Sequence, residues 1–176
     1  QRQMCIRDRY DKDLVSWPEV AGPRRPLGPL VLESDRHLVD CPELLLRPTA
    51  ERDALLLQGG LKRPYTDRVL LRSPRRYGEY LQGLFKRGMA FPGLYARATV
   101  GVFFVRKKDG SLRIITATRL ANCSFKDPPK TRLPTPGAFT SLELAHGAKL
   151  YMSQGDVENA FHQMLLPESL RDLFVL

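Results

Sequence analysis

Cysteine is scarce in this chain, and the cysteines stand far apart. The three of them, Cys5, Cys41 and Cys123, form no Cys-x-x-Cys pair among the 176 residues. This spacing argues against a structural zinc site and against a disulfide framework, because both need cysteines at characteristic separations. We therefore expect an intracellular protein of a reducing compartment that is not secreted.

Long apolar runs are also absent. No stretch approaches the ~20 apolar residues that a transmembrane helix needs, and the first residues are charged, so we expect neither a membrane protein nor a secretory signal. Hydrophobic residues make up 43% and charged residues 27% of the chain, which is the composition of a globular protein. The length fits one domain, or one domain with an extension.

Both ends of the sequence have the character of cut ends. The chain begins at Gln1 and stops at Leu176 within the apolar run 173–176, so we expect a fragment of a longer protein. Residues 1–9 also resemble translated adaptor sequence, and the fold prediction leaves them out for that reason.

Positive charge is concentrated in the middle of the chain. The net charge is +9, yet residues 62–132 alone hold 17 Lys and Arg against 4 Asp and Glu. A block this basic repels itself unless an anion is near, and a nucleic-acid backbone is the commonest such anion. A solvated basic surface is the plainer alternative for an isolated charge run.

Proline dominates the first part of the chain. Six prolines within residues 10–48 disfavour regular structure, so this segment is predicted to be an irregular arm or linker. A short helix is expected over 50–58, with Thr49 as its cap and Gly59 at its end.

A firmer helix is predicted after this arm. Ser73 is a good N-cap, and Pro74 suits the first helical position. Five apolar residues then recur at helical spacing, and Gly88 suits the left-handed conformation that closes a helix. The five residues are Tyr77, Tyr80, Leu81, Leu84 and Phe85.

Two strand-like runs follow around a turn. Residues 100–105 and 112–118 are rich in β-branched and aromatic side chains, and Asp109-Gly110 between them is a strong turn signal. The pattern predicts an antiparallel hairpin. Four cations lie close to its tip: Arg106, Lys107, Lys108 and Arg113.

The last part of the chain predicts a carboxylate at the end of a strand. After a helix over 141–146, residues 149–157 are expected to form a strand that runs into Asp156, and residues 158–165 a short turn or helix. Asp156 is then either a cap for the segment that follows or a ligand for a hard cation. Magnesium commonly takes one or two carboxylates together with substrate phosphates, and the basic hairpin suits such a substrate.

Four sequence blocks follow one another between residues 105 and 163. They are residues 105–113, then Arg119 with Asn122, then 132–136, and finally 155–163. In order and spacing they resemble the fingers and early palm of reverse transcriptases, the RNA-directed DNA polymerases of retrotransposons and retroviruses. The resemblance covers about residues 72–176, as a partial polymerase domain, and leaves the arm 1–71 unassigned.

This resemblance implies an α+β fragment of a right-hand polymerase, with the fingers hairpin and helices followed by the first palm strand. It implies that the parent enzyme adds deoxynucleoside triphosphates to a primer 3′-hydroxyl on an RNA or DNA template, with two magnesium ions.

The resemblance also implies roles for five residues. Asp156 matches the first catalytic aspartate, which binds both magnesium ions, and Val157 matches the residue whose backbone carbonyl helps to hold one of them. Lys107 and Arg113 match the residues that grip the triphosphate of the incoming nucleotide. Phe161 matches the aromatic residue that packs under the sugar and disfavours a ribose 2′-hydroxyl.

Each of these assignments has a plainer alternative. Phe161 could simply pack in the core, and Lys107 could be an exposed charge on the hairpin. Arg113 could form an ion pair with Asp109. His162 is expected to be partly buried and unligated.

The sequence departs from the family pattern in two ways. Ala117 and Thr118 stand where the family has an acidic and an aromatic residue before Arg119. The family's paired aspartates have no counterpart in the chain, and two-metal catalysis needs that second supply of carboxylates. We therefore expect this fragment to be inactive alone, and marginally stable because its last apolar strand would lack neighbours.

Two other functions stay open at this point. The first is a non-catalytic, basic nucleic-acid-binding module, such as a degenerate retroelement relic, whose binding would be salt-sensitive. The second is an unrelated α/β domain whose basic face binds an acidic protein.

Overall fold

The computed structural model describes residues 9–19, 23–130 and 135–176, and within them the chain is a mixed α+β fold. None of the helices in these ranges is both long and apolar enough to cross a bilayer. The strands are β1 (Val15–Ser16), β2 (Arg25–Pro26), β3 (Gly101–Arg106), β4 (Leu112–Ala117) and β5 (Met164–Leu165). The α-helices are α1 (Arg36–Asp40), α2 (Thr49–Gln58), α3 (Arg68–Leu71), α4 (Pro74–Lys86), α5 (Arg119–Asn122), α6 (Pro136–Thr140), α7 (Ala160–Gln163) and α8 (Glu168–Arg171), with 3-10 turns η1 (Gly28–Leu30), η2 (Glu33–Asp35) and η3 (Pro42–Leu45).

The chain divides into two compact units. Gln1–Lys126 and Asn159–Leu176 form the first unit, and Asp127–Glu158 forms the second. All five strands of the described residues belong to the first unit, whereas the second contains α6. The division of the chain at residue 71 stays a prediction.

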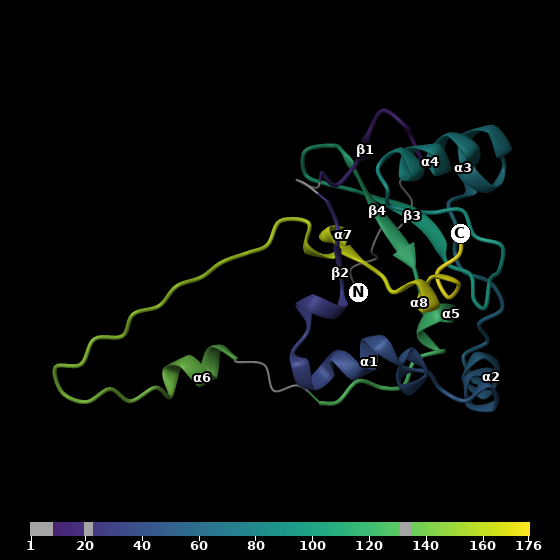
Figure 1. Cartoon of the computed structure of the whole chain (residues 1–176). Helices are drawn as coiled ribbons and strands as arrows, with labels where there is room; N and C mark the ends of the chain where they lie inside the picture. Colours follow the sequence, from purple (N-terminus) through teal and green to yellow (C-terminus); the bar gives the residue numbers. More distant parts are fainter. Residues whose placement is uncertain (1–8, 20–22, 131–134) are drawn as a thin grey trace. The chain divides into compact units, whose positions relative to one another are not determined.

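The predicted hairpin is confirmed. β3 and β4 pair antiparallel, with Gly101 opposite Ala117 and Arg106 opposite Leu112 (Figure 1). Gly110 lies in the turn with a φ of 85°, a left-handed conformation that glycine adopts without the steric cost of a Cβ atom.

A third strand extends this hairpin from the N-terminal segment. β1 pairs in parallel with β4, so that Ser16 lies opposite Arg113, and the sheet order is β1-β4-β3. The backbone N–H of Leu112 donates to the carbonyl of Leu14 at 2.7 Å. Residues 10–48, expected to be an irregular arm, thus contribute a strand to the central sheet.

The predicted helix after the arm is also confirmed, as α4. The hydroxyl of Ser73 accepts a hydrogen bond from the backbone N–H of Arg76, which satisfies one free donor of the first turn. Pro74 is the first helical residue, and Gly88 follows the helix with a φ of 60°. The sequence therefore marks both ends of α4 correctly.

One face of the sheet and one face of α4 make the core. Phe104 and Leu112 from the hairpin are almost fully buried, as are Tyr80 and Leu84 from α4. Tyr10 belongs to the same cluster, since its ring centroid lies 5.2 Å from that of Phe104 and 5.9 Å from that of Tyr80. The N-terminal segment is therefore part of the core.

The C-terminal segment pairs with the residues that precede β3. Val100 donates its backbone N–H to the carbonyl of Val175 at 2.7 Å, and Leu173 is buried. Arg97 makes a two-pronged ion pair with Asp172 at 2.7 and 2.8 Å, and this hydrogen bonding raises the pKa of Arg97. The expectation that the last apolar run lacks neighbours is wrong, because the 97–100 backbone supplies them.

Helix starts differ from the predictions at two places. Thr49 is the first residue of α2 rather than its cap, and its side chain makes no capping bond because Pro48 occupies the N-cap position. The helix expected over 141–146 is wrong. α6 lies before it, because the hydroxyl of Thr135 accepts from Ala138 and Pro136 occupies the first helical position.

The strand expected over 149–157 is also wrong. These residues form neither helix nor strand, and their side chains are exposed. A strand needs a partner for its backbone hydrogen bonds, and no described strand pairs with this segment. The short helix expected after it is confirmed as α7, and residues 132–134 of the third sequence block lie outside the described residues.

Gly101 is required where β3 passes the loop before α3. A Cβ atom there would overlap the backbone carbonyl of Tyr65, and backbone cannot move aside as a side chain can. Gly101→Ala should therefore lower the free energy of unfolding by about 2 kcal/mol or more, measured by urea denaturation. Gly93→Ala is the control, since a Cβ at Gly93 meets no atom within 4 Å. Equal stability of the two variants would contradict the packing described.

Candidate functional site

The tip of the hairpin is fixed by short hydrogen bonds. Lys107 donates its backbone N–H to the carbonyl of Ser111 at 2.7 Å, and Gly110 donates to the carbonyl of Lys107 at 3.0 Å. One carboxylate oxygen of Asp109 accepts from the backbone N–H of Ser111 at 2.9 Å and from its hydroxyl at 2.6 Å. This turn presents its charged side chains in a defined arrangement.

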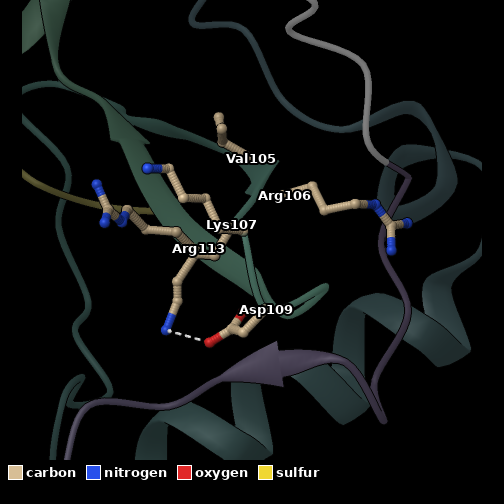
Figure 2. Close-up of a pocket in the computed structure, with 6 residues that line it drawn as sticks. Val105, Arg106, Lys107, Asp109 and Arg113 are labelled. Carbon is tan, nitrogen blue, oxygen red and sulfur yellow. Dashed lines mark ion pairs between the residues drawn. The ribbon is translucent and has the colours of Figure 1, made fainter.

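A pocket of about 460 Å³ lies at this tip. Figure 2 shows the residues around it and the ion pair between Lys107 and Asp109. The lining contains four cations, one carboxylate and one apolar side chain, which favours an anionic ligand. The lining residues are Val105, Arg106, Lys107, Lys108, Asp109 and Arg113.

Lys107 is held between two oxygen atoms. Its Nζ donates to the hydroxyl of Ser16 at 2.9 Å and lies 3.6 Å from a carboxylate oxygen of Asp109. The side chain is 31% exposed, so it is not the freely exposed charge of the plainer interpretation. One of its three donors remains for a ligand.

Arg113 stands directly opposite Val105 in the hairpin. Its side chain is exposed and makes no hydrogen bond or ion pair with any residue that the structure describes, and Asp109 pairs with Lys107 instead, so the alternative that Arg113 pairs with Asp109 is wrong. Arg106 and Arg113 reach to opposite sides of the hairpin (Figure 2), and Arg106 donates to the carbonyl of Gly110 at 3.1 Å. The planar guanidinium of Arg113 suits two-pronged binding of phosphate.

Asp109 is the one acid in this basic setting. The hydroxyl of Ser111 lowers the pKa of Asp109 most, followed by the backbone N–H of Ser111, and the charge of Lys107 lowers it further. The carboxylate therefore stays ionised at neutral pH and keeps its attraction for Lys107.

Phe161 is on α7 and is 87% exposed, so the alternative of core packing is wrong. Its neighbour His162 is partly buried, as expected, and burial followed by the charge of Arg24 lowers the pKa of His162. The carbonyl of His162 accepts a hydrogen bond from Arg24 at 2.8 Å, beside the parallel pair of β2 and β5.

Asp156 and Val157 belong to the second unit, and both are exposed. The N-cap of α7 is Asn159, so the alternative that Asp156 caps this helix is wrong. The assignment of Asp156 and Val157 to one site with the hairpin residues stays a prediction.

The donors of these two residues fit magnesium in kind. A carboxylate and a backbone carbonyl are the oxygen ligands that this ion prefers. Among the described residues, however, no group of three or more His, Cys, Asp or Glu side chains is arranged to hold a metal. A two-ion centre would need further carboxylates besides Asp156.

Sequence reasoning missed Ser16. The run Val15-Ser16-Trp17 alternates apolar and polar residues, which is the only local signal of a strand, and the prolines around it favour irregular structure. Its contact with Lys107 depends on the pairing of β1 with β4.

The chain matches no family model, no curated protein and no solved structure. The hairpin tip and the residues around it are therefore the basis for assigning a function.

The hydroxyl of Ser111 can be tested as the main cause of the low pKa of Asp109. Ser111→Ala removes that hydrogen bond but keeps the backbone one, so the pKa of Asp109 should rise part of the way to its ordinary value. A carboxyl-carbon NMR titration measures it. Ser34→Ala, which removes an exposed serine hydroxyl elsewhere, should leave the pKa unchanged. An unchanged value in Ser111→Ala would show that another group sets it.

Proposed function

We propose that the chain is the fingers and early palm of a reverse transcriptase, with the hairpin tip as its grip on the triphosphate of the incoming nucleotide. One observation carries the proposal. Lys107 and Arg113, which the resemblance assigns to this grip, line a single basic pocket, and the side chain of Arg113 has no partner among the described residues.

Lys107 and Arg113 have different roles in this proposal. Arg113 offers a planar fork that can bind two oxygens of one phosphate group, whereas Lys107 offers a compact charge. The pocket draws the triphosphate from solution through its net positive charge. Asp109 contributes by holding the ammonium of Lys107 rather than by touching the nucleotide.

The other assigned residues complete the proposal. The exposed ring of Phe161 is free to pack under a sugar. Asp156 and the carbonyl of Val157 would hold magnesium, which when bound stabilises the charge that develops during nucleotidyl transfer. The nucleotide would be added to the 3′-hydroxyl of a primer on an RNA or DNA template.

A second function is favoured by the arginines of α3, α4 and the turn between them. Four of them are exposed on a short stretch of chain, and such a surface binds nucleic-acid phosphates without sequence preference. They are Arg68, Arg72, Arg75 and Arg76. A non-catalytic nucleic-acid-binding module would use this surface and would have no need of a nucleotide pocket.

Arg113→Gln tests the nucleotide grip in the 176-residue chain. The variant should weaken dTTP binding about tenfold or more, because a charged hydrogen bond to phosphate contributes ~1.5–3 kcal/mol. Isothermal titration calorimetry measures the affinity, with thymidine as the ligand without phosphates.

Arg63→Gln is the matched control, because Arg63 is exposed and lies outside the pocket. It should bind dTTP like the wild type. If the wild type binds salt-sensitively to DNA but not to dTTP, the second function is the correct one.

Asp156→Asn tests the catalytic assignment in a polypeptide that carries the rest of the palm. The amide keeps the shape of the side chain but loses the charge that holds magnesium, so primer extension should be abolished. Template-primer binding, measured by fluorescence anisotropy, should stay nearly unchanged. Full extension activity in this variant would refute the metal-ligand role.

A further inference from the structure

We propose that Ser16, from the N-terminal segment, is a positioning residue for phosphate binding in the pocket at the hairpin tip. Its hydroxyl holds the ammonium of Lys107 at the pocket, so that this cation is in place before a polyphosphate arrives. The proposal deepens the proposed function and rests on the part of it that puts a triphosphate at the hairpin tip.

The geometry around Lys107 carries the inference. Its Nζ donates to the Ser16 hydroxyl at 2.9 Å, and the Asp109 carboxylate is 3.6 Å away on a turn fixed by Ser111. A lysine stem has many rotamers, and ordering it costs conformational entropy when a ligand binds. Two oxygen acceptors order the ammonium in advance and leave one of its donors for an anion.

Ser16 is itself held firmly. β1 places it opposite Arg113, and the preceding residue, Val15, is buried in the core. The following residue, Trp17, stacks on Tyr80 with ring centroids 5.8 Å apart. The residues on both sides of Ser16 are therefore packed, and its hydroxyl has a defined position.

Helix α4 is shaped to receive this strand. A Cβ atom at Gly83 would approach the indole of Trp17 to 2.8 Å, so glycine lets the ring lie close to the helix. The guanidinium of Arg87 lies 4.3 Å from the centre of the same ring, a cation–π contact. The N-terminal segment thus connects the core to two of the four cations of the pocket, by contact with Lys107 and by strand pairing with Arg113.

The test uses inorganic tripolyphosphate and the 176-residue chain in isothermal titration calorimetry. Ser16→Ala should weaken binding about fivefold, which corresponds to the ~1 kcal/mol of a typical hydrogen bond. In a Lys107→Met background the same substitution should have no further effect, because Ser16 acts through Lys107. Ser34→Ala, at an exposed serine outside the pocket, should bind like the wild type.

A second pair of variants separates positioning from folding. Ser16→Thr keeps the hydroxyl and Ser16→Val replaces it with a methyl group, and both are β-branched residues that suit a strand. Threonine should restore the wild-type affinity and valine should not, at equal melting temperatures. Equal affinities for the two variants would overturn the proposal, as would a full effect of Ser16→Ala in the Lys107→Met background.

The outcomes also separate this inference from the proposed function. Tripolyphosphate binding that depends on Lys107 but not on Ser16 would overturn the positioning role alone. Binding that depends on both residues, without any binding of dTTP, would support the positioning role and overturn the polymerase assignment. A wild-type chain that binds no tripolyphosphate would overturn both.

Discussion

Three aromatic rings hold together segments that are far apart in the sequence. Phe104 of β3 contacts Tyr10 from the N-terminal segment and Tyr80 from α4, with ring centroids 5.2 and 5.7 Å apart, and the latter pair meets edge to face. Such pairs add ~0.5–1.5 kcal/mol each beyond the burial of their area. Burial raises the pKa of Tyr80, so its hydroxyl stays protonated in the folded chain. The direction in which the hairpin points depends on this cluster.

The same two strands supply both the core and the candidate site. Phe104 and Leu112 face inward, whereas their neighbours Val105 and Arg113 line the pocket, because side chains alternate along a strand. A slip of one residue would exchange the two sets, so the packing of the core also fixes the pocket. The Asp109-Gly110 turn signal is visible in the sequence, which is why Arg113 could be placed close to the tip. Ser16 could not, because its role depends on a strand of two residues.

Predictions from the sequence succeeded where local chemistry decides the structure. The caps of α4 and the Asp-Gly turn of the hairpin are short-range signals, and both elements lie where they were predicted. The pairing of β1 with β4, and of residues 97–100 with the C-terminal segment, involves few residues and depends on tertiary contact. The prediction of a strand over 149–157 was wrong because it relied on local composition alone. The composition of this segment suits a strand, but the described structure provides no partner for it.

The packing of Trp17 has a practical consequence. It is the only tryptophan of the chain, and it lies against Tyr80 with the charge of Arg87 4.3 Å from the centre of its ring. Release of β1 from the hairpin would move this indole from an apolar contact into water. Its intrinsic fluorescence is therefore a built-in reporter of whether the N-terminal strand is docked, and no added label is needed to follow it.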